Sequence, residues 1–68
     1  MAHGHTPLSP AVVGYLEIAA RYWREWERAV ALADRRRAWR YAELAVRYEG
    51  CAEDLEEAES QPRRGPRR

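Results

Sequence analysis

The residues of this chain that could do covalent or metal chemistry are few and far apart. Its 68 residues hold one cysteine, Cys51, and two histidines, His3 and His5. A catalytic thiol needs a neighbouring base and an orienting group, and a zinc site needs cysteine and histidine at short, fixed spacings. A histidine near a free amino terminus can chelate copper or nickel with backbone nitrogens, but two histidines alone do not predict a metal site. We therefore expect no catalytic, cofactor or metal site, and a protein that is not an enzyme.

The acidic run from Glu53 to Glu59 is a second candidate for cation binding. It lacks the glycine and the alternating oxygen ligands of a calcium loop. The sequence also has no glycine-rich phosphate loop and no nucleophile elbow. We expect these carboxylates to be hydrated at the end of a helix, and Cys51 to serve as a small apolar side chain.

Side chains suited to binding are more numerous. Trp39 follows three arginines, and helical spacing turns it away from the main apolar series, which favours a role as an anchor for a partner. The arginines suit a phosphate-binding surface made of a helix face and a C-terminal arm, although the net charge of +1 does not by itself favour nucleic acid. The residues of this alternative are Arg35, Arg36, Arg37, Arg40, Arg47, Arg63, Arg64, Arg67 and Arg68.

Two stretches with helical periodicity must position these side chains. Ser9 followed by Pro10 is typical of a helix start. An apolar stripe then recurs with the helical period, and it contains Val12, Tyr15, Leu16, Ala19, Tyr22, Trp23, Trp26, Ala29, Val30 and Ala33. The stripe predicts a helix over about residues 9–34, with Trp23 and Trp26 in its core.

A second apolar series predicts a helix over about residues 37–59. Its members alternate steps of three and four residues, namely Tyr41, Leu44, Tyr48, Cys51, Leu55 and Ala58. Because Asp34, Arg37 and Arg40 interrupt the apolar pattern between the two series, we expect the turn there. The predicted fold is all-α, a two-helix antiparallel hairpin, and Gly50 leaves open a short third helix after it.

The alternative is one long continuous helix in a coiled coil, since the two series are in phase and the link between them has no glycine or proline. That helix would place two arginines on the coiled-coil seam, so we favour the hairpin. Residues 1–8 are expected to form a flexible leader. Residues 60–68, rich in arginine, proline and glycine, are expected to form a disordered tail.

Trp39, Ala42 and Val46 give the second helix apolar surface in another direction, which one hairpin cannot cover. Self-association into a four-helix bundle would cover it. Because this helix begins with basic residues and ends with acidic ones, an antiparallel copy would bring opposite charges together. The expected partner is a second copy, forming a dimer, or a larger protein. The expected interface residues are Trp23, Trp26, Val30, Trp39, Val46, Tyr41, Leu44, Tyr48 and Leu55.

The sequence therefore predicts a small interaction module that acts in assembly or regulation by binding other protein chains. The alternative is an arginine-rich accessory or regulatory protein that binds nucleic acid. No apolar stretch reaches the length of a membrane span, and the apolar segment near the N-terminus lacks a basic leader. With a single thiol, the expected compartment is the cytoplasm.

Overall fold

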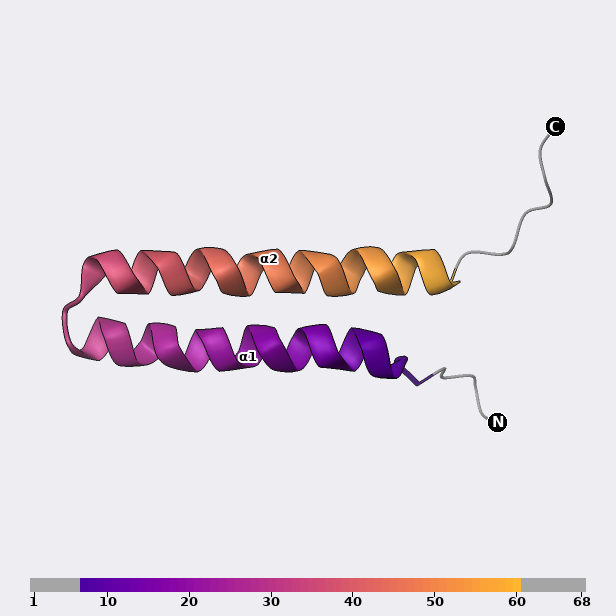
Figure 1. Ribbon diagram of the computed structural model, residues 1–68, viewed down its shortest axis with the longest axis horizontal. Helices are drawn as coiled ribbons and strands as arrows, with labels where there is room; N and C mark the ends of the chain where they lie inside the picture. The colour runs from indigo at the N-terminus through magenta and orange to yellow at the C-terminus, as the bar shows by residue number, and fades with distance from the viewer. Residues whose placement is uncertain (1–6, 61–68) are drawn as a thin grey trace, which may run out of the picture.

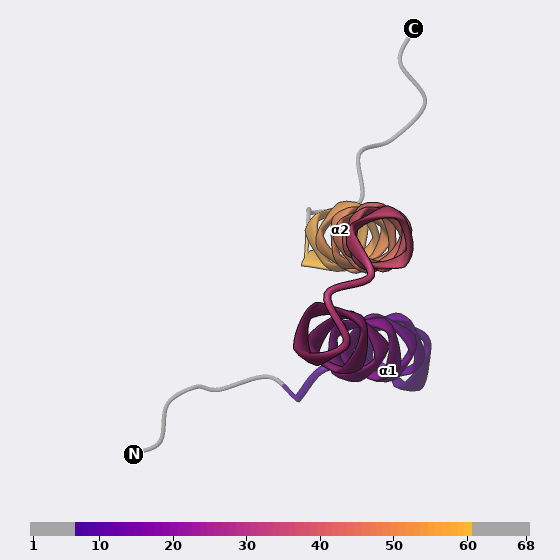
Figure 2. The ribbon, with the colours of Figure 1, turned by 90° about the vertical axis from the view of Figure 1, so that its left-hand side faces the viewer.

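The chain folds into two antiparallel helices joined by a tight turn (Figure 1). The computed structural model describes residues 7–60, in which α1 spans Pro10–Ala31 and α2 spans Arg35–Ser60. The all-α hairpin is therefore confirmed, and the alternative of one continuous helix is wrong. Viewed from the turn, the hairpin is a single layer of two helices (Figure 2). Neither helix is long and apolar enough to cross a membrane.

Ser9 caps α1, as the Ser9–Pro10 pair predicts. Its hydroxyl oxygen accepts the N–H of Val12 at 3.2 Å. Pro10, which has no N–H to satisfy, stands at the start of the first turn. The same hydroxyl donates to Oε2 of Glu59 at 3.0 Å. The beginning of α1 is thereby joined to the end of α2.

The turn at residues 32–34 closes α1 with a Schellman motif. The N–H of Ala33 donates to the carbonyl of Val30 at 2.9 Å, and the N–H of Asp34 donates to the carbonyl of Ala29 at 2.8 Å. Ala33 has a φ of 58°, in the left-handed region, where this motif usually has glycine. The motif ends α1 before the predicted boundary at residue 34, and it does so without glycine or proline.

Asp34 begins α2 as its N-cap. Its Oδ1 accepts the N–H of Arg37 at 3.1 Å, and its carbonyl accepts the N–H of Ala38 at 2.9 Å. A capping aspartate satisfies an N–H group that the first helical turn leaves without a partner. The helix therefore starts before the predicted boundary at residue 37, and Arg37 lies inside its first turn.

The seam between the helices is built from small side chains. Its buried residues are Val12, Ala19, Ala29, Ala38, Ala45 and Ala52. The three alanines of α2 recur at intervals of seven, the repeat that keeps one helix face against a partner helix. Small side chains let two helices approach closely, but they remove little apolar area from water. The hairpin therefore has a thin core.

Tyrosine rings extend the seam beside the alanines. The ring of Tyr22 in α1 contacts both Tyr41 and Tyr48 of α2, with centroid separations of 6.2 and 5.8 Å. Tyr15 lies 6.2 Å from Tyr48. Such aromatic pairs add contact area that alanine lacks. They also fix how the two helices are aligned along their axes, because Tyr22 lies beside the stretch of α2 between Tyr41 and Tyr48.

Two features of α2 differ from the sequence prediction. The helix continues through Gly50, so the described residues contain no third helix. The face of α2 against α1 is centred on the buried alanines, whereas Leu44 and Cys51 of the predicted series are half-buried and Ala58 is exposed. The predicted series lies to one side of the true seam, because large apolar residues dominate the pattern and alanine does not.

Candidate functional site

The exposed large apolar side chains of the two helices gather on one side of the hairpin. Val13, Leu16 and Val30 of α1, with Trp39 and Val46 of α2, are between 37% and 69% exposed. Single exposed apolar residues are ordinary on a protein surface, but several on one side are typical of a binding surface. We call these five residues the apolar face.

Helical geometry places the members of the apolar face on the same side. In α1, Trp23 lies seven residues from both Leu16 and Val30, so the three share one flank of the helix. In α2, Glu49 lies three residues after Val46 and faces the same way. Nε1 of Trp23 donates to Oε2 of Glu49 at 2.8 Å. Because this bond joins the two flanks directly, they lie on one side of the hairpin.

The interface residues predicted from the sequence fall into two groups. Val30, Trp39 and Val46 belong to the apolar face, and the half-buried Trp23 lies beside it. The remaining predicted residues are all half-buried: Trp26, Tyr41, Leu44, Tyr48 and Leu55. Trp26 packs edge-on against Trp23 with centroids 5.5 Å apart, and the rings of Tyr41 and Tyr48 stack on α1. Tyr41 and Tyr48 are therefore engaged with α1, whereas Leu44 also lines a hollow on the outer side of α2.

Val13 and Leu16 are members of the apolar face that the sequence pattern did not identify. Leu16 belongs to the predicted core stripe, and Val13 belongs to no stripe. The alanine-rich surface of α2 covers only a narrow strip of α1, so residues at the edge of the stripe stay exposed. The apolar stripe of α1 is wider than one partner helix can cover. That width was the signal in the sequence for a second contact surface.

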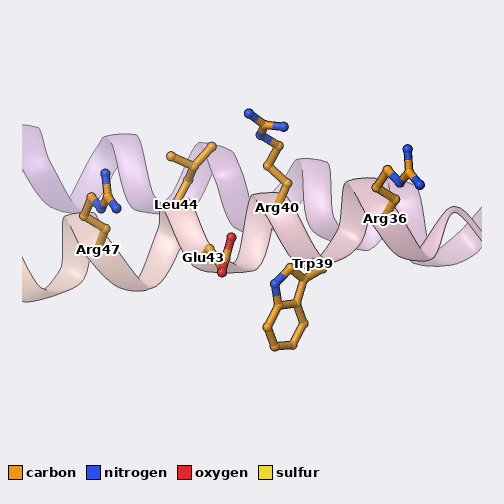
Figure 3. Close-up of a pocket in the computed structure, with 6 residues that line it drawn as sticks. All are labelled: Arg36, Trp39, Arg40, Glu43, Leu44 and Arg47. Carbon is orange, nitrogen blue, oxygen red and sulfur yellow. The ribbon is translucent and has the colours of Figure 1, made fainter.

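A hollow on the outer side of α2 holds part of the predicted nucleic-acid surface (Figure 3). Its lining residues are Arg36, Trp39, Arg40, Glu43, Leu44 and Arg47. The three arginines project to one side of the helix, whereas the ring of Trp39 projects to the opposite side. Within residues 7–60, none of these three guanidinium groups forms a salt bridge. The arginine row and the Trp39 ring therefore line this hollow from different sides of α2.

The described residues include two more arginines of the nucleic-acid alternative. Arg35 and Arg37 lie in the first turn of α2, where Nε of Arg37 pairs with Oδ2 of Asp34 at 3.6 Å. Several candidate residues lie outside the described part of the chain: Arg63, Arg64, Arg67, Arg68, His3 and His5. Among residues 7–60, the structure thus gathers Arg36, Arg40 and Arg47 around one hollow, and Arg37 lines a neighbouring hollow with Arg36 and Arg40.

The charges of α2 are arranged against its own dipole. Its first turn contains no acidic residue and its last turn no basic one. Residues 35–37 begin the helix with arginines, and most of residues 53–59 are acidic. The helix dipole favours negative charge at the start and positive charge at the end. Beyond the Asp34 cap, opposite charge for the arginines that begin α2 and for the acidic residues that end it would have to come from another element.

The residues with metal-binding or nucleophilic side chains are dispersed over the described part of the chain. Among residues 7–60, no three His, Cys, Asp or Glu side chains lie close enough together to hold a metal ion. Cys51 is a half-buried free thiol. Comparison of the chain with models of known families, with curated proteins and with solved structures gave no match, so no relative suggests an activity or a partner.

Proposed function

We propose that this chain is a protein–protein interaction module that acts in assembly or regulation by binding, without catalysis. The observation that carries this proposal is the apolar face, in which five large apolar side chains on one side of the hairpin remain in contact with water. The partner is a protein, either a second copy of the chain or another polypeptide. A module with one thiol suits the cytoplasm.

The thin core of the hairpin supports this proposal. Each buried alanine removes one methyl group from water, and a buried CH₂ is worth about 0.8 kcal/mol. Burying a whole valine, leucine or larger apolar side chain is worth roughly 1.5–3 kcal/mol. Burying the apolar face would therefore contribute a stabilisation comparable to that of the alanine seam, and only a partner can bury it.

Trp39 is the proposed anchor of the interface. It is the most exposed member of the apolar face, at 69%. Tryptophan is enriched among the few residues that dominate binding energy in protein interfaces. Beside it, a second hollow is lined by Trp39, Ala42, Glu43, Val46 and Arg47. This hollow can receive an apolar side chain of the partner next to the indole ring.

Site-specific photo-crosslinking in the cells that produce the chain tests the proposal. A photoreactive amino acid replaces Val30 or Val46 on the apolar face, or Arg21 on the opposite side of α1 as the matched control. We expect covalent protein adducts from positions 30 and 46 and none from position 21. Adducts of equal yield at all three positions, or none at any, would contradict binding through the apolar face.

A nucleic-acid function is the second candidate, supported by the row of Arg36, Arg40 and Arg47. Guanidinium groups without acidic partners can contact phosphates, and such binding weakens steeply with added salt. Titration of the full chain with duplex and single-stranded nucleic acid tests it. Binding at physiological salt that Arg36→Gln and Arg40→Gln both weaken would favour this function. Absence of detectable binding would exclude it.

A further inference from the structure

We infer that the partner of the apolar face is a second copy of this chain. The two hairpins pack face to face and antiparallel, so that each α2 lies along the α2 of the other copy. This inference rests on the proposed function and names the occupant of the surface. The resulting assembly is a bundle of four helices.

The charges of α2 select this arrangement over the other face-to-face packing. If the two turns met at the same end, two-fold symmetry would set each α2 against α1 of the other copy. Residues 35–37 of both copies would then gather at one end of the bundle, and the acidic residues 53–59 of both copies at the other. In the antiparallel arrangement, the turn of one hairpin lies beside the open end of the other. The basic start of each α2 then lies beside the acidic end of its counterpart, which attracts where the alternative repels.

The spacing of residues along α2 supplies a register. Arg35, Trp39, Ala42, Val46, Glu49 and Glu53 follow one another in alternating steps of four and three, the pattern of a helix contact seam. We take the register in which Ala42 lies opposite Val46 of the second copy. The same register places two further pairs opposite one another, namely Arg35 with Glu53 and Trp39 with Glu49. A shift of seven residues in one direction would put Glu49 on Val46 and Glu53 on Ala42. The opposite shift would carry Glu53 past the end of the facing helix.

α1 supplies an independent check on this register. Its seam on the same side runs through Val13, Leu16, Ala20, Trp23, Glu27 and Val30, again in steps of three and four. Antiparallel contact of Val13 with Val30 of the second copy places Ala20 opposite Trp23, a small residue against a large one. It also places Leu16 opposite the exposed Glu27. This α1 seam is centred beside Tyr22, and the α2 seam is centred between Ala42 and Val46.

The two centres stand at one level of the hairpin. Tyr22 contacts both Tyr41 and Tyr48, so it lies beside the middle of the α2 seam. A single two-fold axis therefore serves both seams, as a symmetric dimer requires. If the α1 and α2 seams had different centres along the hairpin, one two-fold axis could not bring both into contact.

Glu49 links the hairpin to the second copy. Its Oε2 accepts the indole N–H of Trp23 at 2.8 Å. The register places Trp39 of the second copy opposite Glu49, whose other oxygen, Oε1, can accept that indole N–H. One half-buried carboxylate thus serves one tryptophan from each copy.

Disulfide mapping on the full chain tests the arrangement. Cys51→Ala removes the native thiol, and Arg35→Cys and Glu53→Cys are introduced into this background one at a time. The two variants are mixed under reducing conditions and then oxidised, and each is also oxidised alone. We expect a cross-linked dimer from the mixture only, because in the antiparallel register the two Arg35 positions are about 27 Å apart along the helix axis.

The other outcomes overturn the inference. A disulfide from Arg35→Cys alone would show that the two α2 helices are parallel. Dimers in sedimentation that give no Arg35→Cys to Glu53→Cys disulfide would show another packing. A chain that sediments as a monomer at every concentration would exclude the second copy. The proposed function would still stand in that case if positions 30 and 46 gave photo-adducts with a protein of different mass.

Discussion

Trp23 of α1 and Glu49 of α2 form a hydrogen bond across the hairpin, from Nε1 to Oε2 at 2.8 Å. A second side-chain bond between the helices joins Ser9 to Glu59 at the open end. The Trp23–Glu49 bond lies instead along the edge of the apolar face. It therefore fixes the relative rotation of the two helices where the proposed partner binds.

Glu49→Ala should lower the free energy of unfolding by about 1–2 kcal/mol, since it removes a charged acceptor from a half-buried indole. Glu49→Gln keeps a side-chain oxygen at the same distance along the chain and should lose clearly less. Urea denaturation at one fixed chain concentration measures both variants. Equal losses in the two variants would mean that the hydrogen bond has no part in stability.

Ala45→Leu should lower the free energy of unfolding by about 1–3 kcal/mol, because Ala45 is fully buried and a larger side chain forces the helices apart. Ala58→Leu is the matched control, since Ala58 is exposed on the same helix. It should stay within about 0.5 kcal/mol of the parent chain. If both substitutions were neutral, the alanines would not form a close seam.

Ala33→Gly should raise the free energy of unfolding by roughly 0.5–1 kcal/mol. Ala33 has a φ of 58°, and this left-handed conformation costs an alanine about 1–2 kcal/mol. Glycine avoids that cost but loses more backbone entropy on folding, so only part of it is gained as stability. Ala31→Gly, at the helical end of α1, should instead lower stability. Thermal melts of the two variants check the prediction, and a loss of stability in Ala33→Gly would argue against the left-handed turn.

The helices could be predicted from the sequence, but the turn between them could not be placed correctly. Ser9 and Pro10 are a recognisable start signal, and the structure uses them as such. The end of α1 depends on Ala33 in a position where glycine is usual, so the expected stop signal is missing from the sequence. Asp34 was the available signal for the start of α2, because aspartate is a preferred N-cap.

Only the structure distinguishes the residues of the helix seam from those of the apolar face. Tyr41 and Tyr48 are large and apolar enough to suggest an interface, yet their rings stack on Tyr22 of α1. Trp26 packs against Trp23 of its own helix. The seam follows alanines at intervals of seven in α2, which carry a weak hydrophobic signal. Trp39 and Val46, by contrast, could be assigned to another side of α2 from helical spacing alone, and both are exposed.

Sedimentation velocity of the full chain over a dilution series distinguishes a dimer from a monomer. We expect a reversible dimer for the parent chain. We expect a monomer for Val46→Glu, which places a charge at the centre of the apolar face, and a dimer for Arg21→Glu on the opposite side. A parent chain that stays monomeric at every concentration and still melts cooperatively would contradict the inferred dimer.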